Sequence, residues 1–106
     1  MGILIKVGLK TFDNTDNAAS VGASATVTIR TISGKGSAVL AFVGDGGVDV
    51  TMKVSVDGGA DISLGAANSQ AITTYSFSIS LVIKATNAGS GSENYSTVSS
   101  TGTLQA

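Results

Sequence analysis

The feature that most constrains the fold is an alternation of apolar and polar residues with a period of two. It is clearest in VDVTMKVSV (48–56), where every second residue is Val or Met. A period of two places successive side chains on opposite faces of an extended strand, whereas a helix needs apolar residues every three or four positions. No segment shows convincing helical spacing, so the sequence predicts an all-β protein.

The predicted strands are short and are separated by runs rich in Gly, Asn, Asp and Ser. We expect strands at 3–9, 24–32, 37–43, 48–56, 60–64, 74–86 and, more weakly, 93–106, with loops at 12–21, 33–36, 65–71 and 87–92. Segment 37–43 (SAVLAFV) is apolar almost throughout, which is typical of a strand buried on both faces. This order predicts one domain over 1–106, an antiparallel β-sandwich of Greek-key or jelly-roll type with about seven to eight strands.

Alternation also predicts which side chains face the core. In the first strand they are Ile3, Ile5, Val7 and Leu9; in the second, Ala25, Val27 and Ile29, with Arg30 on the opposite face; in the fourth, Val48, Val50, Met52, Val54 and Val56; in the long segment 74–86, Tyr75, Phe77, Ile79, Leu81, Ile83 and Ala85.

Several function classes are excluded by what the sequence lacks. The chain contains no Cys and no His, so zinc sites and His- or Cys-based catalysis are not expected. Its six cations are spread along the chain without a basic cluster, so we expect no nucleic-acid partner. No apolar run reaches the ~18 residues of a membrane span, and the N-terminus lacks the apolar segment of a signal peptide. We therefore expect a protein made in the cytoplasm, without a membrane partner.

The phrase Asp-Gly-Gly occurs at 45–47 and again at 57–59, at the two ends of the predicted strand 48–56. Each phrase is followed closely by a further aspartate, Asp49 or Asp61. Asp45, Asp49, Asp57 and Asp61 could offer oxygen ligands to calcium, but their spacing fits neither the EF-hand loop nor the calcium-binding β-helix repeat. Asp-Gly is also the strongest short hairpin signal. We prefer two hairpin turns, and no metal or cofactor is assigned.

Other possible sites are weaker. Oxygen-bearing residues at 13–17 are those that loops normally contain. Gly34-Lys35-Gly36-Ser37 lacks the spacing and the helix of a phosphate loop, so a hairpin turn is preferred. Asn94-Tyr95-Ser96 is a glycosylation sequon without a signal peptide, and we treat it as coincidence.

Tyr75 and Tyr95 could stack on a sugar, but Tyr75 shares its face with Phe77, which favours core packing. Glu93 is the only Glu and has no partner constellation, so no catalytic residue is assigned.

The strands lack the usual protection against edge-to-edge association. The chain has no Pro and only 12% charged residues, whereas natural sheets protect their edges with Lys, Pro or bulges. Such a domain is better explained as a subunit whose neighbours cover its edges, normally in a symmetric assembly.

Three stretches resemble small β-sandwich virion proteins of tailed bacteriophages. They are ISGKGSA (32–38), KVSVDGG (53–59) and YSFSISLVIK (75–84), which correspond to a glycine turn before a buried strand, a "VDG" hairpin and a late aromatic-led strand. The resemblance covers about half of the chain. It implies a minor capsid, decoration or tail-associated role, usually as a trimer or larger ring, and it carries no catalytic residues. The low aromatic and charge content departs from this family.

From these features we expect a non-enzymatic virion structural protein that decorates the capsid by protein–protein adhesion. Its partners would be the major capsid protein or other virion proteins, and sister subunits in a homo-oligomer, with a trimer favoured. Two alternatives stay open: a tail-associated carbohydrate-binding or host-adhesion module, and a filament-forming β protein.

Overall fold

The computed structural model describes residues 8–105, and every regular element in that range is a β-strand. The ten strands are β1 (Leu9–Asp16), β2 (Ser20–Val21), β3 (Thr26–Ser33), β4 (Gly36–Phe42), β5 (Val50–Val56), β6 (Ile62–Ala66), β7 (Ala71–Phe77), β8 (Ser80–Asn87), β9 (Glu93–Asn94) and β10 (Val98–Gln105).

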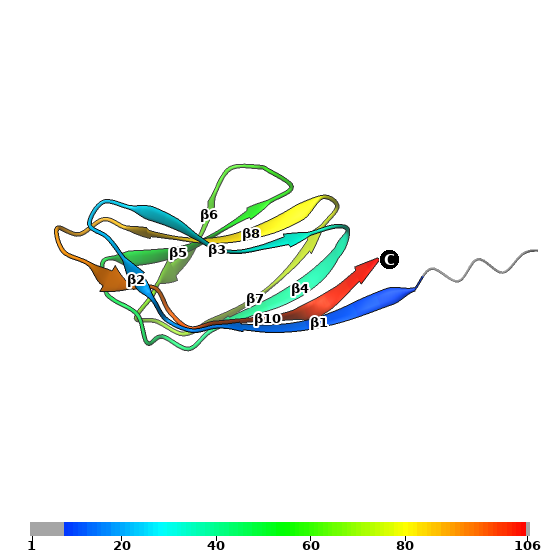
Figure 1. The fold of residues 1–106 in the computed structure, drawn as a ribbon, viewed down its shortest axis with the longest axis horizontal. Helices are drawn as coiled ribbons and strands as arrows, with labels where there is room; N and C mark the ends of the chain where they lie inside the picture. Colours follow the sequence, from blue (N-terminus) through cyan, green and yellow to red (C-terminus); the bar gives the residue numbers. More distant parts are fainter. Residues whose placement is uncertain (1–7, 106) are drawn as a thin grey trace, which may run out of the picture.

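Eight long strands form two four-stranded antiparallel sheets. The first sheet has the order β1-β10-β4-β7 and the second sheet has the order β3-β8-β5-β6, while β2 and β9 form a small separate pair. Figure 1 shows the two sheets as facing layers, with the β2–β9 end between them on the left. This strand order is that of a jelly roll, a double sheet of eight strands. The predicted antiparallel sandwich is therefore confirmed, with two short strands beyond the expected eight.

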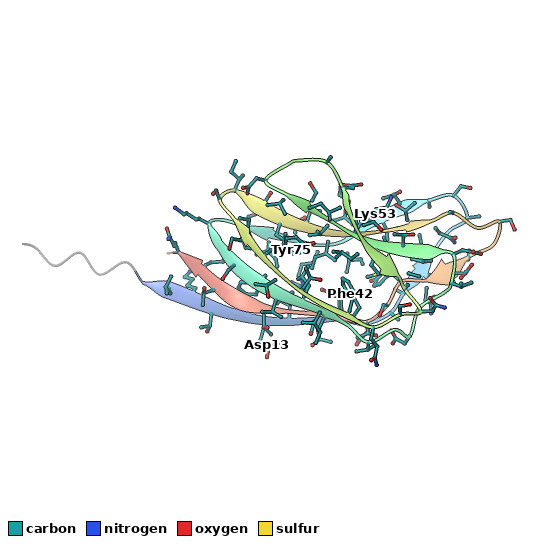
Figure 2. All side chains as sticks on the ribbon, turned by 180° about the vertical axis from the view of Figure 1, so that it is seen from behind. Asp13, Phe42, Lys53 and Tyr75 are labelled. Atoms are coloured by element: carbon teal, nitrogen blue, oxygen red, sulfur yellow. The ribbon has the colours of Figure 1, made fainter. Side chains whose placement is uncertain are left out.

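The core lies between the two sheets and is built from alternate residues of their central strands. Its fully buried side chains include Leu40 from the first sheet and Met52, Leu81 and Ile83 from the second. Phe42 and Tyr75 also point into the space between the layers in Figure 2, whereas Asp13 points away from it. Each large core side chain contributes roughly 1.5–3 kcal/mol through its burial.

The N-terminal prediction was partly wrong. Residues 3 and 5, and Val7, lie outside the described residues, and Leu9 is exposed. The first half of the predicted loop 12–21 belongs to β1, which pairs along its whole length with β10. Phe12, Asn14 and Asp16 are the half-buried positions of β1. The alternation is present there, but polar residues occupy two of the three inward positions and conceal it.

Strand β4 is buried on one face only, contrary to the prediction. Ala38, Leu40 and Phe42 are buried, whereas Val39 is 39% exposed on the opposite face. The apolar composition of 37–43 therefore does not mark a doubly covered strand. It marks a strand whose outer face is apolar and uncovered within the described residues.

The predicted long strand 74–86 is two strands in different sheets. β7 ends at Phe77, Ser78 and Ile79 form the turn, and β8 begins at Ser80. Ile79 is exposed rather than buried. Alternation continues through the turn, so the sequence pattern gives no sign that the chain crosses from one sheet to the other.

A bulge in β3 reverses the expected direction of Arg30. The pairing of β3 with β8 shifts between Thr28 and Arg30, which leaves Ile29 as the extra residue. After the bulge, the even-numbered Ile32 is the buried residue. Arg30 shares that parity, and its guanidinium forms a two-point ion pair with Asp16 of β1, at 2.7 and 3.0 Å. The bulge thus turns a side chain predicted to face outward into a link between the two sheets.

Candidate functional site

The first Asp-Gly-Gly phrase (45–47) lies in the connection that carries the chain from β4 in the first sheet to β5 in the second sheet. The hairpin predicted there is therefore wrong. The Asp45 carboxylate accepts hydrogen bonds from the Thr97 backbone N–H at 2.6 Å and the Thr97 hydroxyl at 2.7 Å, and a longer one from Ser96. These donors, the Thr97 hydroxyl first, lower the pKa of Asp45. Val48, predicted to face the core, is 67% exposed in the same connection.

The second phrase (57–59) is a hairpin turn between β5 and β6, as predicted. Asp57 and Gly58 both have positive φ, and the Gly59 N–H donates to the Val56 carbonyl at 2.9 Å. This is the pattern of a two-residue turn that favours Asp-Gly.

The Asp57 carboxylate has a further role in this hairpin. It accepts the backbone N–H groups of Ser78, Ile79 and Ser80 at 2.6 to 3.1 Å. These amides, Ile79 first, lower the pKa of Asp57. The carboxylate therefore fastens the turn between β7 and β8.

The four aspartates considered for calcium do not converge. Asp45 and Asp57 lie at opposite ends of β5. Asp61 forms an ion pair with Lys84 at 3.0 Å, and the backbone N–H of Asp49 donates to the Glu93 carboxylate at 3.2 Å. Within residues 8–105 no group of three or more acidic side chains is placed to hold a metal ion. The carboxylates of Asp45, Asp57 and Asp61 instead bind backbone amides, hydroxyls and a lysine.

The glycine turn at 33–36 connects β3 to β4 and leads into a strand, not into a helix. Gly34 has a φ of +124°, a conformation that favours glycine, and its N–H donates to the Ile79 carbonyl at 2.7 Å. The Lys35 carbonyl accepts the Gln105 N–H at 2.8 Å. The prediction of a hairpin turn here is wrong, because β3 and β4 lie in different sheets. The backbone groups of this crossing hold neighbouring segments together.

The two tyrosines, and the serine of the sequon, are part of the packed structure. Tyr75 and Tyr95 are partly buried and pack against the core, which confirms the prediction for Tyr75. Asn94 is exposed in β9, but Ser96 of the same sequon is fully buried and its hydroxyl accepts the Gly44 N–H. Glu93 lies against Gly47, and its carboxylate accepts the Asp49 backbone N–H.

No enclosed site replaces these candidates. In the part of the chain that the structure describes, no pocket is detected. The described residues also contain no helix long and apolar enough to cross a membrane. The remaining surfaces with a distinct chemistry are the outer faces of the two sheets.

The outer face of the first sheet is nearly uncharged. It consists of Thr11, Asp13, Thr15, Ser37, Val39, Ala41, Ile72, Thr74, Ser76, Ser99, Thr101 and Thr103, which the strand registers place in three parallel rows. Asp13 is its only charge, and Figure 2 shows it pointing away from the core. Ala41 lies opposite Ile72, which is 77% exposed, and Val39 lies opposite Thr74. Ile72 and Val39 are therefore diagonal neighbours, about 7–8 Å apart in such pairings.

The outer face of the second sheet is different. Lys53 of β5 lies directly opposite Lys84 of β8, and Asp61 pairs with Lys84. Two like charges in direct register disfavour close packing against another apolar sheet, because both would have to lose water. The first sheet is thus the better candidate for a broad protein contact.

Sequence reasoning missed this surface for a definite reason. Val39 was assigned to a doubly buried strand, and Ile72 was not assigned to a strand at all. Only the pairing of β4 with β7 brings Val39, Ala41 and Ile72 together. A scan of the chain against protein-family models finds no match, and a search of curated proteins finds no similar sequence.

Proposed function

We propose that the chain is a non-enzymatic structural subunit of a virion that decorates the capsid through protein–protein adhesion. The observation that carries the proposal is the nearly uncharged outer face of the first sheet, which holds Val39, Ala41 and Ile72. An exposed surface that combines apolar and hydroxyl side chains can bury area against a partner with little loss of charge solvation.

Three further features support the proposal. The jelly-roll order is shared by viral capsid domains, although fold alone does not assign function. The resemblance of 32–38, 53–59 and 75–84 to phage virion proteins points to the same class. The acidic residues considered for chemistry hold backbone amides and a lysine instead of sharing a site.

Density-gradient fractionation of particles from the infected cells that make the chain would test this role. The chain is expected in the particle band, and Val39→Asp is expected to release it, because the new charge must be desolvated at the contact. Thr31→Asp, at an exposed position of edge strand β3 in the second sheet, is the matched control and should stay bound. Thermal unfolding of both free variants verifies their folding. Wild-type protein that never enters the particle band would overturn the proposal, and glycan binding by that protein would favour the adhesion module.

A further inference from the structure

Of the four strands at sheet edges in residues 8–105, β7 is the least protected against pairing with another strand. The edges are β1 and β7 in the first sheet and β3 and β6 in the second. β3 carries the bulge and Arg30, and β6 has only five residues and an irregular pairing with β5. β1 carries Lys10, Asp13 and Asp16. Charges, bulges and short length are the usual devices that prevent edge pairing.

Strand β7 has none of these devices. Its sequence AITTYSF contains no charge, and its seven residues pair with β4 without a register shift. Ile72, the most exposed of the large apolar side chains in the described residues, lies on this strand, with the exposed Thr74 and Ser76 on the same face. Among the described strands, only β4 pairs with β7. The second edge of β7 therefore offers an uninterrupted row of backbone groups to another chain.

The residue order of β7 makes this edge complementary to itself. When two copies of the strand pair antiparallel about a two-fold axis at Thr74, all seven residues find a partner: 71 lies opposite 77, 72 opposite 76, and 73 opposite 75. Opposite residues then share the same parity, so both outer faces lie on one side of the joined sheet and both cores on the other. A shift by one residue would place the core of one copy beside the outer face of the other.

The opposite side chains in this register are favourable pairs. On the outer face, Thr74 meets Thr74 of the second copy at the axis, and Ile72 meets Ser76. On the inner face, the half-buried Thr73 meets the half-buried Tyr75. Thr–Thr pairs and pairs of an aromatic with a β-branched residue both stabilise antiparallel sheets, and no like charges face each other here.

We propose that two copies of the chain associate through β7, which pairs with β7 of the second copy about a two-fold axis at Thr74. The two first sheets then form one eight-stranded sheet, and backbone hydrogen bonds at every second residue pair supply the affinity. The contact uses the same surface on both copies and closes at a dimer, whereas a trimer requires contacts between two different surfaces. This inference goes beyond the proposed function and does not depend on it, since the dimer forms without a capsid.

A charge at the proposed axis tests the contact. Thr74→Lys places two lysines directly opposite each other, and Thr31→Lys, an equally exposed change on the β3 edge, is the matched control. Molar mass is measured by light scattering on a sizing column over a range of concentrations, because a single strand edge buries less than the ~1,200–2,000 Å² of a standard interface and its dimer should dissociate on dilution. Circular dichroism melts verify that each variant is folded.

The wild type and Thr31→Lys are expected to reach twice the monomer mass as the concentration rises, and Thr74→Lys is expected to stay at the monomer mass. A wild type that remains monomeric, a wild type that assembles to another mass, or a Thr74→Lys variant that dimerises as well as the wild type would overturn the inference.

Cysteine variants test the register, because the chain has no cysteine of its own. Opposite positions lie about 5 Å apart, whereas position 76 of one copy lies four strand residues, about 13 Å, from position 76 of the other. With a short thiol crosslinker, Thr74→Cys should form a covalent dimer on a denaturing gel. Ile72→Cys and Ser76→Cys should each stay monomeric alone and form a dimer when mixed 1:1. Thr31→Cys measures crosslinking by random collision.

A covalent dimer of Ser76→Cys alone, or none from Thr74→Cys or from the mixture above the level of Thr31→Cys, would overturn the proposed pairing. None of these results decides particle binding, so the capsid role is judged separately by the gradient experiment with Val39→Asp.

Discussion

The two Asp-Gly-Gly phrases share the same three letters but do different work in the fold. The first, 45–47, is a crossing between sheets, where glycine is needed because other chain segments approach closely. The second, 57–59, is a hairpin turn in one sheet, where glycine is needed for a positive φ. In both, the aspartate binds the backbone of a distant segment: Thr97 for Asp45, and 78–80 for Asp57.

A repeated turn signal therefore specifies local chemistry, not topology. A carboxylate can accept free backbone N–H groups in either setting, so both aspartates stabilise the fold. The glycines differ in what surrounds them. A Cβ added at Gly46 would lie 2.5 Å from the Ala67 Cβ and 2.7 Å from the Asn94 carbonyl oxygen, whereas one at Gly58 would have nothing within 4 Å.

The largest expected effect comes from the matched changes Gly46→Ala and Gly58→Ala. Gly46→Ala should destabilise the protein by about 3 kcal/mol, since packed atoms must move. Gly58→Ala should cost about 1 kcal/mol, since it only forces a positive φ on a residue with a Cβ. Urea unfolding measures both. Equal losses in the free energy of unfolding would contradict the close packing around Gly46.

How much of the fold could be predicted from the sequence depends on whether a feature arises within one segment or from contacts with distant segments. The alternation in 48–56 correctly placed Val50, Met52 and Val54 in the core, and Asp57-Gly58 correctly marked a hairpin. The sheet in which each strand lies could not be predicted, because the same alternation continues through the crossing at Ser78-Ile79. The bulge at Ile29 also left no signal, since it depends on pairing with β8.

The candidate surface was less predictable than the fold. Its apolar residues come from β4 and β7, which are separated along the chain by β5 and β6. The sequence of β4 has an apolar outer face, but it does not show whether that face is covered or which strand lies beside it. The surface exists only once these strands pair, so no local pattern in the sequence could reveal it.

A second comparison uses the serine beside each phrase. Ser96 is fully buried, and its hydroxyl accepts the Gly44 N–H and donates to Asp45. Ser96→Ala should cost about 2 kcal/mol, because it leaves the Gly44 N–H without its acceptor. Ser55 donates to the Gly59 carbonyl at 2.7 Å, so Ser55→Ala removes one neutral bond and should cost about 1 kcal/mol. Denaturant midpoints compare the stabilities of the two variants. A greater loss of stability from Ser55→Ala than from Ser96→Ala would contradict this prediction.

A smaller effect is expected from pH. The pKa values of Asp45 and Asp57 are lower in the folded protein than the ~3.9 of an unfolded chain. Their charged forms therefore stabilise the fold above pH ~3.9, and this stabilisation is lost as the pH falls through the folded pKa values. Asp45→Asn and Asp57→Asn should each reduce the acid dependence of the melting temperature between pH 5 and 2. Asp13→Asn, on the exposed outer face, is the control; an acid dependence unchanged in both test variants would contradict the hydrogen-bond assignments.

The smallest expected effect is that of calcium. Asp45 is engaged by Ser96 and Thr97, and Asp57 by three backbone amides, so a metal ion would have to displace donors that the fold itself requires. Adding millimolar calcium or a chelator should leave the melting temperature of the wild type unchanged. A calcium-dependent rise would contradict this expectation. If Asp45→Asn abolished that rise and Asp57→Asn did not, the ion would lie at the crossing between the sheets, and the two phrases would differ in ligand chemistry as well as in backbone geometry.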